Sequence, residues 1–344
     1  MLHILAGGWG YPNLGDEAIL TGYRDFFASQ RIDALVTSAN PERTASAIGV
    51  PRHDLGVEGS ALTGHSTGSM ILGGGGYLNA SWIPEIHRKL KRLIADRRSR
   101  PLVGHSIEVR GVEDPRFRRK LARLLSEEAR ISVRDEQSAD ALSRIGHNVD
   151  VLPDAISLLY PAVNKFAGHI SYVTGRVVLN LLDISRRPDS TESLFPVDRW
   201  NDFASQLISR LGSKCIVMTV GDGDEKFLLS LPPVDVIKPK TVTEMISVLA
   251  SASGVISVRM HPALIASMIG RPTLSIPYCG KVRPTLKKLR LDELLVQSAD
   301  VDEALARLTD ERSFDEAWSA AHAECASWLR DLVGSDQSPR ADAR

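Results

Sequence analysis

The chain has 344 residues, of which 43% are hydrophobic and 24% are charged, a composition typical of soluble globular proteins. Its 42 basic and 42 acidic residues cancel, which excludes a global charge field that would recruit nucleic acid or an anionic membrane. Any anion site must therefore be local. The length exceeds that of one ordinary core and predicts two domains of about 150 to 170 residues each.

The three cysteines, Cys215, Cys279 and Cys325, are far apart in the sequence and form no CxxC pair. This argues against a disulfide framework and a structural zinc site, and without an HxxxH or HExxH pattern we predict no metal. The N-terminus has no basic leader, and no stretch of about 18 consecutive apolar residues occurs. We therefore expect a cytoplasmic protein that does not span a membrane.

The first half of the chain alternates predicted strands with predicted helices. A strand at residues 2–6 leads into the glycine-rich loop 7–15 and a helix from Asp16. The loop does not fit GxGxxG, because the third glycine would fall at Asn13. A strand at residues 69–72 opens into four glycines, Gly73 to Gly76, which let the backbone approach a ligand closely.

Further alternation predicts a parallel sheet with right-handed crossovers. Helices are expected at residues 84–97 and 115–129, and strands at 101–109, 130–133 and 149–152. Arg134 follows one of these strands and is either a ligand cation or the partner of Asp135 or Glu136. The helix expected at residues 84–97 is basic and would either contact anionic lipid or present a solvated face. Its cations are Lys89, Lys91, Arg92, Arg97 and, just beyond, Arg98.

The second half repeats the pattern after a weakly patterned stretch. We predict an N-terminal domain at residues 1–160, a linker at 161–175, a second domain at 176–333 and a disordered tail at 334–344. The pair Asp222 and Asp224 precedes a helix, where aspartates cap, so capping is predicted rather than metal binding.

The segment 253–281 contains a strand, a helix, a second strand and a cationic loop. Pro262 suits the first helical position, so a helix is predicted at residues 262–269, and Gly270 ends it. Arg259, His261 and Lys281 then fall at the carboxyl edge of one sheet, beside a helix N-terminus whose dipole favours negative charge. This arrangement predicts an anion site, although an ordinary βαβ unit with surface cations would give the same pattern.

Six stretches together resemble the polysaccharide pyruvyl transferase family. They follow the family's order along nearly the whole chain: residues 13–19 (NLGDEAI), 73–78 (GGGGYL), 131–135 (ISVRD) with Ser138, 153–155 (PDA), 257–261 (SVRMH), and Tyr278 with Lys281 and Val282. The resemblance implies two Rossmann-like domains of α/β class facing across a cleft, as in GT-B glycosyltransferases. It also implies transfer of the enolpyruvyl carbon of phosphoenolpyruvate onto two hydroxyls of one sugar, which forms a pyruvate ketal and releases phosphate.

Under this resemblance the second domain binds phosphoenolpyruvate, which is a co-substrate, and no further cofactor is expected. Arg134, Arg259 and Lys281 are the predicted donor-binding cations. His261 is the predicted acid that protonates the methylene carbon, or else it only binds phosphate. Asp16 is the predicted residue that binds or deprotonates an acceptor hydroxyl, or else it only caps its helix. The first domain is the acceptor side, where contacts or a backbone cradle are expected from Asn13, Gly15, Gly74, Gly75 and Gly76.

The sequence departs from the family pattern at two places. Asn180 and Asp183 stand where a family-like arginine is expected, and residues 105–108 (HSIE) replace a glycine-proline turn. Both departures concern the acceptor more than the donor. The expected acceptor is a sugar of a cell-surface glycan or glycolipid precursor, on a lipid-linked intermediate at the inner membrane face. The alternatives are a GT-B glycosyltransferase that uses a nucleotide sugar and a catalytically silent saccharide-binding relative.

Overall fold

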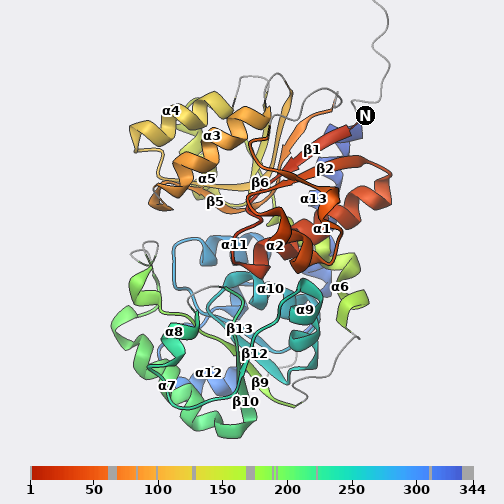
Figure 1. The fold of residues 1–344 in the computed structure, drawn as a ribbon. Helices are drawn as coiled ribbons and strands as arrows, with labels where there is room; N and C mark the ends of the chain where they lie inside the picture. The colour runs from red at the N-terminus through yellow and green to blue at the C-terminus, as the bar shows by residue number, and fades with distance from the viewer. Residues whose placement is uncertain are drawn as a thin grey trace, which may run out of the picture.

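A computed structural model describes residues 2–60, 68–82, 84–97, 100–125, 129–167, 175–187, 190, 193–221, 224–309 and 312–334. The chain forms two parallel β-sheets with helices packed around them, one above the other in Figure 1. The predicted α/β class with two facing Rossmann-like units is confirmed. The predicted tail falls almost entirely outside the described residues.

The N-terminal sheet has the strand order β3-β2-β1-β4-β6-β7-β8, and β5 also pairs with β6. Its strands are β1 (Leu2–Ala6), β2 (Asp33–Ser38), β3 (Leu55–Val57), β4 (Met70–Leu72), β5 (Gly75–Asn79), β6 (Leu102–Arg110), β7 (Arg130–Val133) and β8 (Asp150–Val151). The helices of this unit are α1 (Leu14–Gln30), α2 (Pro41–Ile48), α3 (Glu85–Arg97), α4 (Pro115–Leu124), α5 (Glu136–Ser143) and the 3-10 helix η3 (Ala155–Leu159). The sequence patterns do not predict β2, α2, β3 or β5.

The C-terminal sheet has the order β11-β10-β9-β12-β13. Its strands are β9 (Val177–Asn180), β10 (Cys215–Met218), β11 (Val236–Ile237), β12 (Gly254–Ser257) and β13 (Thr273–Ser275). The helices that follow in the chain are α6 (Tyr160–Ala167), α7 (Trp200–Leu211), α8 (Asp224–Leu228), α9 (Val242–Ser251), α10 (Met260–Met268), α11 (Val282–Lys288), α12 (Val301–Arg307) and α13 (Asp315–Gly334). Helix α6 occupies the first half of the segment predicted as a linker, where the sequence pattern predicts no helix. Its apolar residues pack on η3 and α9, which gives it the tertiary support that the sequence pattern does not reveal.

Each sheet has one point where the strand order reverses. In the N-terminal sheet the chain moves outward in both directions from β1 and β4, and in the C-terminal sheet from β9 and β12. Open α/β sheets bind ligands outside the carboxyl ends of the strands at such points. The fold therefore offers two ligand-binding crevices, one on each sheet.

The two units are held together by α1 and α13. Helix α1 packs against α9 and α10, and the backbone N–H of Leu14 donates to the carbonyl of Val220 at 3.2 Å. Helix α13, drawn in blue in Figure 1, lies beside the N-terminal sheet although it is the last helix of the described residues. There the Trp328 ring stacks on His105 with the centroids 5.6 Å apart. The predicted domain boundaries stay a prediction.

Candidate active site

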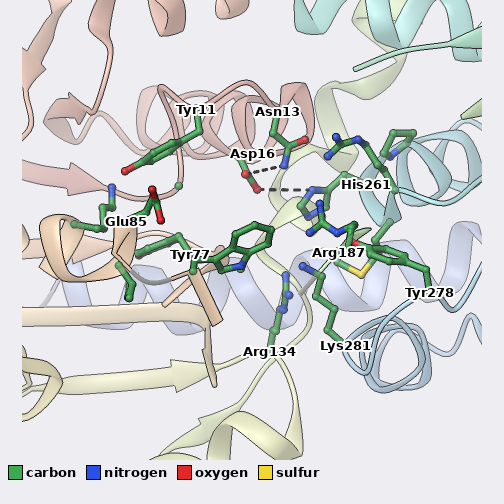
Figure 2. Close-up of a pocket in the computed structure, with 18 residues that line it drawn as sticks. Tyr11, Asn13, Asp16, Tyr77, Glu85, Arg134, Arg187, His261, Tyr278 and Lys281 are labelled. Carbon is green, nitrogen blue, oxygen red and sulfur yellow. Dashed lines mark hydrogen bonds and ion pairs between the residues drawn. The ribbon is translucent and has the colours of Figure 1, made fainter. Parts of the chain in front are cut away.

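A cavity of about 260 Å³ lies between the two units, with walls from both (Figure 2). The loop after β1, the glycines after β4 and the start of α3 form one wall. The other wall comes from the start of α10 and the loops after β9 and β13. The cavity thus covers the reversal point of the N-terminal sheet and reaches the carboxyl end of β12.

Asn13 and Asp16 are placed in this cavity by the start of α1. Asn13 is the N-cap: its side-chain oxygen accepts from the N–H of Gly15 at 3.2 Å. Its amide nitrogen donates to the Asp16 carboxylate at 2.8 Å. The alternative in which Asp16 caps the helix is therefore wrong, since a cap must precede the first turn and Asn13 already occupies that position. The Asp16 carboxylate faces the cavity instead.

His261 lies between two carboxylates of the N-terminal unit. Its Nδ1 is 3.9 Å from Asp16 Oδ1, and its Nε2 is 3.9 Å from Asp154 Oδ1. The imidazole is 9% exposed, and Nε2 is buried with no hydrogen-bond partner among the described residues. A Cβ on Gly15 would lie only 2.6 Å from Nδ1, so glycine is required there for the units to meet. The histidine is thus a contact between the units as well as a cavity residue.

Asp154 is the buried member of this group. One oxygen accepts from the N–H of Ile156 at 2.9 Å and so caps η3, and the other accepts from Arg134 at 2.9 Å. Burial acts to raise the pKa of Asp154, but the facing His261 imidazole and the Arg134 charge outweigh it and hold the pKa well below its usual value. Asp154 is therefore an anion fixed behind His261.

Arg134 reaches the cavity but is fully engaged with carboxylates. Its side chain is 1% exposed and forms ion pairs with Glu108, with Asp154, and at 3.9 Å with Asp135. Asp135, one of the two partners predicted from the sequence, forms the longest of these ion pairs. The two closer partners, Glu108 and Asp154, come from segments that are distant in the sequence. The negative charges of Glu108 and Asp154 overcome the effect of burial and raise its pKa. Its predicted role in donor binding stays a prediction.

Arg259 and Lys281 stand on the opposite wall. The backbone N–H of Arg259 donates to the Asn180 side chain at 3.1 Å, and its guanidinium donates two bonds to Asp224, at 2.8 and 3.2 Å. Asp224, the first residue of α8, is thus the ion-pair partner of Arg259. Asp222 and Gly223 lie outside the described residues.

Lys281 has no hydrogen bond or ion pair with any described residue, and Figure 2 shows its ammonium group pointing into the cavity beside Arg134. Burial would lower the pKa of Lys281, but the Tyr278 hydroxyl and the Glu108 carboxylate together raise it. Lys281 is therefore a fixed cation.

The three glycines of the predicted cradle that follow β4 have different surroundings. Gly76 lines the cavity, where a Cβ would lie 2.5 Å from Glu108 and 3.1 Å from Lys281. Gly75 has a φ of +119°, and its Cβ would lie 3.5 Å from Asp16. Gly74 packs tightly on Ala155 instead. The glycines thus allow charged side chains from three segments to converge.

Three charged residues in or directly behind the cavity are missing from the predicted site residues. Asp154 follows β8 as Arg134 follows β7, and this strand-end position is the signal that could have revealed it. Glu108 lies within a strand, where no local pattern distinguishes it. The Arg187 guanidinium lies 4.9 Å from the Trp82 ring centroid and 5.4 Å from that of Tyr278, a contact between units that no sequence spacing reports.

Lys89 is also a cavity residue, and its predicted place on an exposed basic helix face is wrong. It is 2% exposed, pairs with Glu58, and lies over the rings of Tyr77 and Tyr11 at 5.2 and 5.7 Å. The buried carboxylate draws it inward, because a lysine can be buried when its charge is paired. With Tyr11, Tyr77 and Trp82, this part of the cavity wall is aromatic.

A model of the family described as polysaccharide pyruvyl transferase matches residues 13–280, most of the chain. The chain belongs to the polysaccharide pyruvyl transferase family. The resemblance read from the six motifs is thereby confirmed. The search of curated proteins found no match for this pyruvyl transferase family member.

Solved structures similar to this family member share its fold at low sequence identity. UDP-GlcNAc 2-epimerase from Methanocaldococcus jannaschii, in complex with UDP-GlcNAc and UDP, has a TM-score of 0.62 at 11% identity, over 96% of this chain and 99% of that one. A putative UDP-N-acetylglucosamine 2-epimerase from Listeria monocytogenes has a TM-score of 0.60 at 11% identity, over 99% and 98%. An alpha-glucosyltransferase in complex with UDP and DNA has a TM-score of 0.55 at 10% identity, over 98% of each chain. These are GT-B proteins, and the likeness concerns the fold alone.

None of the helices in the described part of the chain combines the length and the apolar character needed to cross a membrane.

Proposed function

We propose that this protein transfers the pyruvyl group of phosphoenolpyruvate onto two hydroxyls of one sugar, forming a ketal and releasing phosphate. Membership of the family supports this, and one observation carries it. The cavity between the units holds His261 between two carboxylates, next to the cations Lys281 and Arg259. A donor with a phosphate and a carboxylate needs several fixed cations close to a proton donor.

Lys281 is the cation best suited to bind the donor directly, because its ammonium group is not committed to a carboxylate of the described chain. Arg259 offers the remaining donors of a guanidinium already held in place by Asp224. Arg134 contributes its charge from behind this pair. We propose phosphoenolpyruvate as the donor and no cofactor besides it.

His261 supplies the proton that the methylene carbon of phosphoenolpyruvate must gain. The Asp154 carboxylate lies on the Nε2 side of the imidazole, and Nδ1 is on the side of Asp16 and the cavity. The first sugar hydroxyl then forms a bond to the central carbon, phosphate leaves with the electrons of its C–O bond, and the second hydroxyl forms the other ketal bond. Of the two hydroxyl protons, one balances the proton given to the methylene and the other leaves with phosphate.

Asp16 is the proposed base for the acceptor hydroxyl, because its carboxylate is held at the cavity by Asn13. The sugar would lie along the aromatic wall of Tyr11, Tyr77 and Trp82. The proposed acceptor is a sugar of a cell-surface glycan or glycolipid precursor. Action in the cytoplasm, with peripheral contact at the inner membrane face, is part of the same proposal.

Phosphate release from phosphoenolpyruvate with a panel of galactosides, glucosides and mannosides tests the proposal. We expect sugar-dependent release in the wild type, loss with His261→Ala, and a raised KM for phosphoenolpyruvate with Arg259→Ala and Lys281→Met. No release with any acceptor, together with thermal stabilisation by a nucleotide sugar and none by phosphoenolpyruvate, would overturn it. That result would favour the glycosyltransferase alternative.

A further inference from the structure

Helices α3 and α4 lie side by side on the outside of the N-terminal unit and concentrate positive charge there (Figure 1). Each helix carries five basic residues, whereas the acidic residues of the pair are Glu85 and the buried Asp96. The whole chain has a formal net charge of zero. The excess of positive charge is therefore local to this part of the surface.

Helix α4 presents a stripe of cations. Arg116, Arg119, Lys120 and Arg123 recur at the spacing that places side chains on one side of a helix. The ammonium group of Lys120 donates to the carbonyl of His87 at 3.2 Å, so the stripe adjoins α3. The three arginines are exposed, and none forms an ion pair or a side-chain hydrogen bond with a described residue. Their charge is therefore not used in holding the helix to the fold.

Helix α3 adds Arg88, Lys91 and Arg92 at exposed positions beside this stripe. Arg88 pairs with Glu85 at 3.2 Å, and Arg92 lies 3.8 Å from the Glu58 carboxylate. Lys91 has no ion pair with a described residue. We call the cations of this surface the basic face: Arg88, Lys91, Arg92, Arg116, Arg119, Lys120 and Arg123. These cations outnumber the acids beside them, so the basic face attracts a partner that carries many negative charges.

The basic face and the active-site cavity share helix α3. The first turns of this helix line the cavity with Glu85, Ile86 and Lys89, whereas Lys91 and Arg92 are exposed to solvent. An α-helix with its side chains is about 10 Å across. A partner on the basic face would therefore lie about one helix diameter from the cavity wall.

The basic face does not suit a nucleic acid. Single strands bind on exposed aromatic rings, and Phe117, the one Phe, Tyr or Trp of α3 and α4, is fully buried. Proteins that read a duplex insert a projecting helix or ribbon into a groove, whereas α3 and α4 pack along each other. Cations spread over two adjacent helices instead match a plane of anionic lipid headgroups, which attracts lysine and arginine by charge alone.

We propose that the basic face docks this protein on the anionic surface of a lipid bilayer. The inference rests on the proposed function in so far as that function brings the protein to a membrane, and it names the surface that makes the contact. It also fixes the orientation, because the cavity wall formed by α3 then lies close to the headgroups.

Sedimentation with vesicles tests the docking. The wild type and the triple variant Arg116→Gln/Arg119→Gln/Arg123→Gln are mixed with vesicles of phosphatidylcholine, with and without phosphatidylglycerol. We expect the wild type to bind only the anionic vesicles and to be released by high salt, because the attraction is between surface charges. Binding by the triple variant should be weaker by about tenfold, since each cation near an anionic bilayer contributes to the attraction.

The control variant Arg199→Gln/Lys214→Gln/Lys240→Gln removes the same charge from exposed positions of the C-terminal unit and should bind as the wild type does. Equal losses in the two triple variants, or equal binding of the wild type to both kinds of vesicle, would overturn the proposal. Tighter binding to duplex DNA or RNA than to anionic vesicles at the same salt, lost in the first triple variant, would also overturn it. The face would then belong to a nucleic acid.

A fluorescent label reports the orientation without any charge substitution. The three native cysteines are buried, so a polarity-sensitive probe can be attached at Ala122→Cys in α4 or, as the control, at Ser213→Cys in the C-terminal unit. Anionic vesicles should shift the emission to the blue at position 122 and leave it unchanged at position 213. The same shift at both positions, or a shift at position 213 alone, would contradict docking by the basic face.

Turnover separates this proposal from the proposed function. With a soluble sugar acceptor the variant Arg116→Gln/Arg119→Gln/Arg123→Gln should release phosphate from phosphoenolpyruvate at the wild-type rate, because these arginines lie outside the cavity. A reduced rate would show that they support the site, and the docking role would be overturned. If the wild type releases no phosphate with any sugar but binds anionic vesicles through the basic face, the proposed function fails and the docking stands.

Discussion

The cations on the two walls of the active-site cavity differ in the number of carboxylates with which they form ion pairs. Arg134, from the N-terminal unit, is 1% exposed and shared among three carboxylates, whereas Arg259 is 16% exposed and has one. Lys281 has none among the described residues. All three follow or lie near strand ends, so the same sequence cue leads to a structural cation on one wall and to cations open to a ligand on the other. We expect substitution of the cation on the first wall to affect mainly stability, and substitution of the cations on the second wall to affect mainly activity.

The largest effect is expected at His261, where the walls meet. His261→Gln should lower kcat by about 10²–10⁴-fold, because the glutamine amide has no proton acidic enough to transfer to the methylene carbon. Stabilisation by phosphoenolpyruvate should persist in a melting assay, since the cations remain. His53→Gln, at an exposed histidine, is the matched control and should keep wild-type rates. Wild-type kcat in His261→Gln would remove this residue from the chemistry.

Arg134 and Arg259 provide the direct test of the comparison. Arg134→Met should lower the free energy of unfolding by about 3–5 kcal/mol, because it leaves buried carboxylates without their cation. Arg259→Met leaves only the Asp224 carboxylate without its cation, so it should lower the free energy of unfolding less than Arg134→Met does. It should raise the KM for phosphoenolpyruvate more. Urea denaturation followed by circular dichroism measures the first quantity. Adding Glu108→Gln to Arg134→Met should restore part of the loss; equal destabilisation by both single variants would contradict the comparison.

Glu17, a buried carboxyl in α1 of the N-terminal unit, provides a test through pH. Burial raises the pKa of this carboxyl from 4.5 to about 7. The folded protein therefore binds a proton that the unfolded chain releases, and stability falls as pH rises from about 4.5 to 7, then levels off. The loss is on the order of 3 kcal/mol. Glu17→Gln should remove this slope in unfolding curves at pH 5 to 8; an unchanged difference between wild type and variant across that range would refute it.

The smallest expected effect concerns the caps of α1 and α2. Asn13→Ala and Asn40→Ala each remove a side-chain cap and should lower stability by about 1 kcal/mol. Only Asn13 also holds the Asp16 carboxylate at the cavity, so only its variant should lower kcat. Melting temperatures and steady-state rates of the two variants separate the cap from the positioning role. Equal rates would show that Asp16 needs no support.

The sequence determined the local units and the order in which they follow one another. Alternating apolar and amphipathic segments predicted both parallel sheets, and the strand, turn and helix of residues 254–268 placed Arg259 and His261 at one edge, because these patterns involve only neighbouring residues. The motifs also identified the family. Even there local patterning had limits, since α6 has its support from η3 and α9 and was predicted as a linker.

Only the tertiary structure decided which charges meet. Glu108 and Asp154 come from other segments of the chain than Arg134, Glu58 draws Lys89 inward, and Arg187 lies between rings of the two units. Such partners are tens of residues or more apart in sequence, and no spacing rule encodes them. Electrostatic pairing depends on distance in space and on burial. For this reason the sequence alone identified the charged residues, whereas the fold decided which of them can bind a substrate.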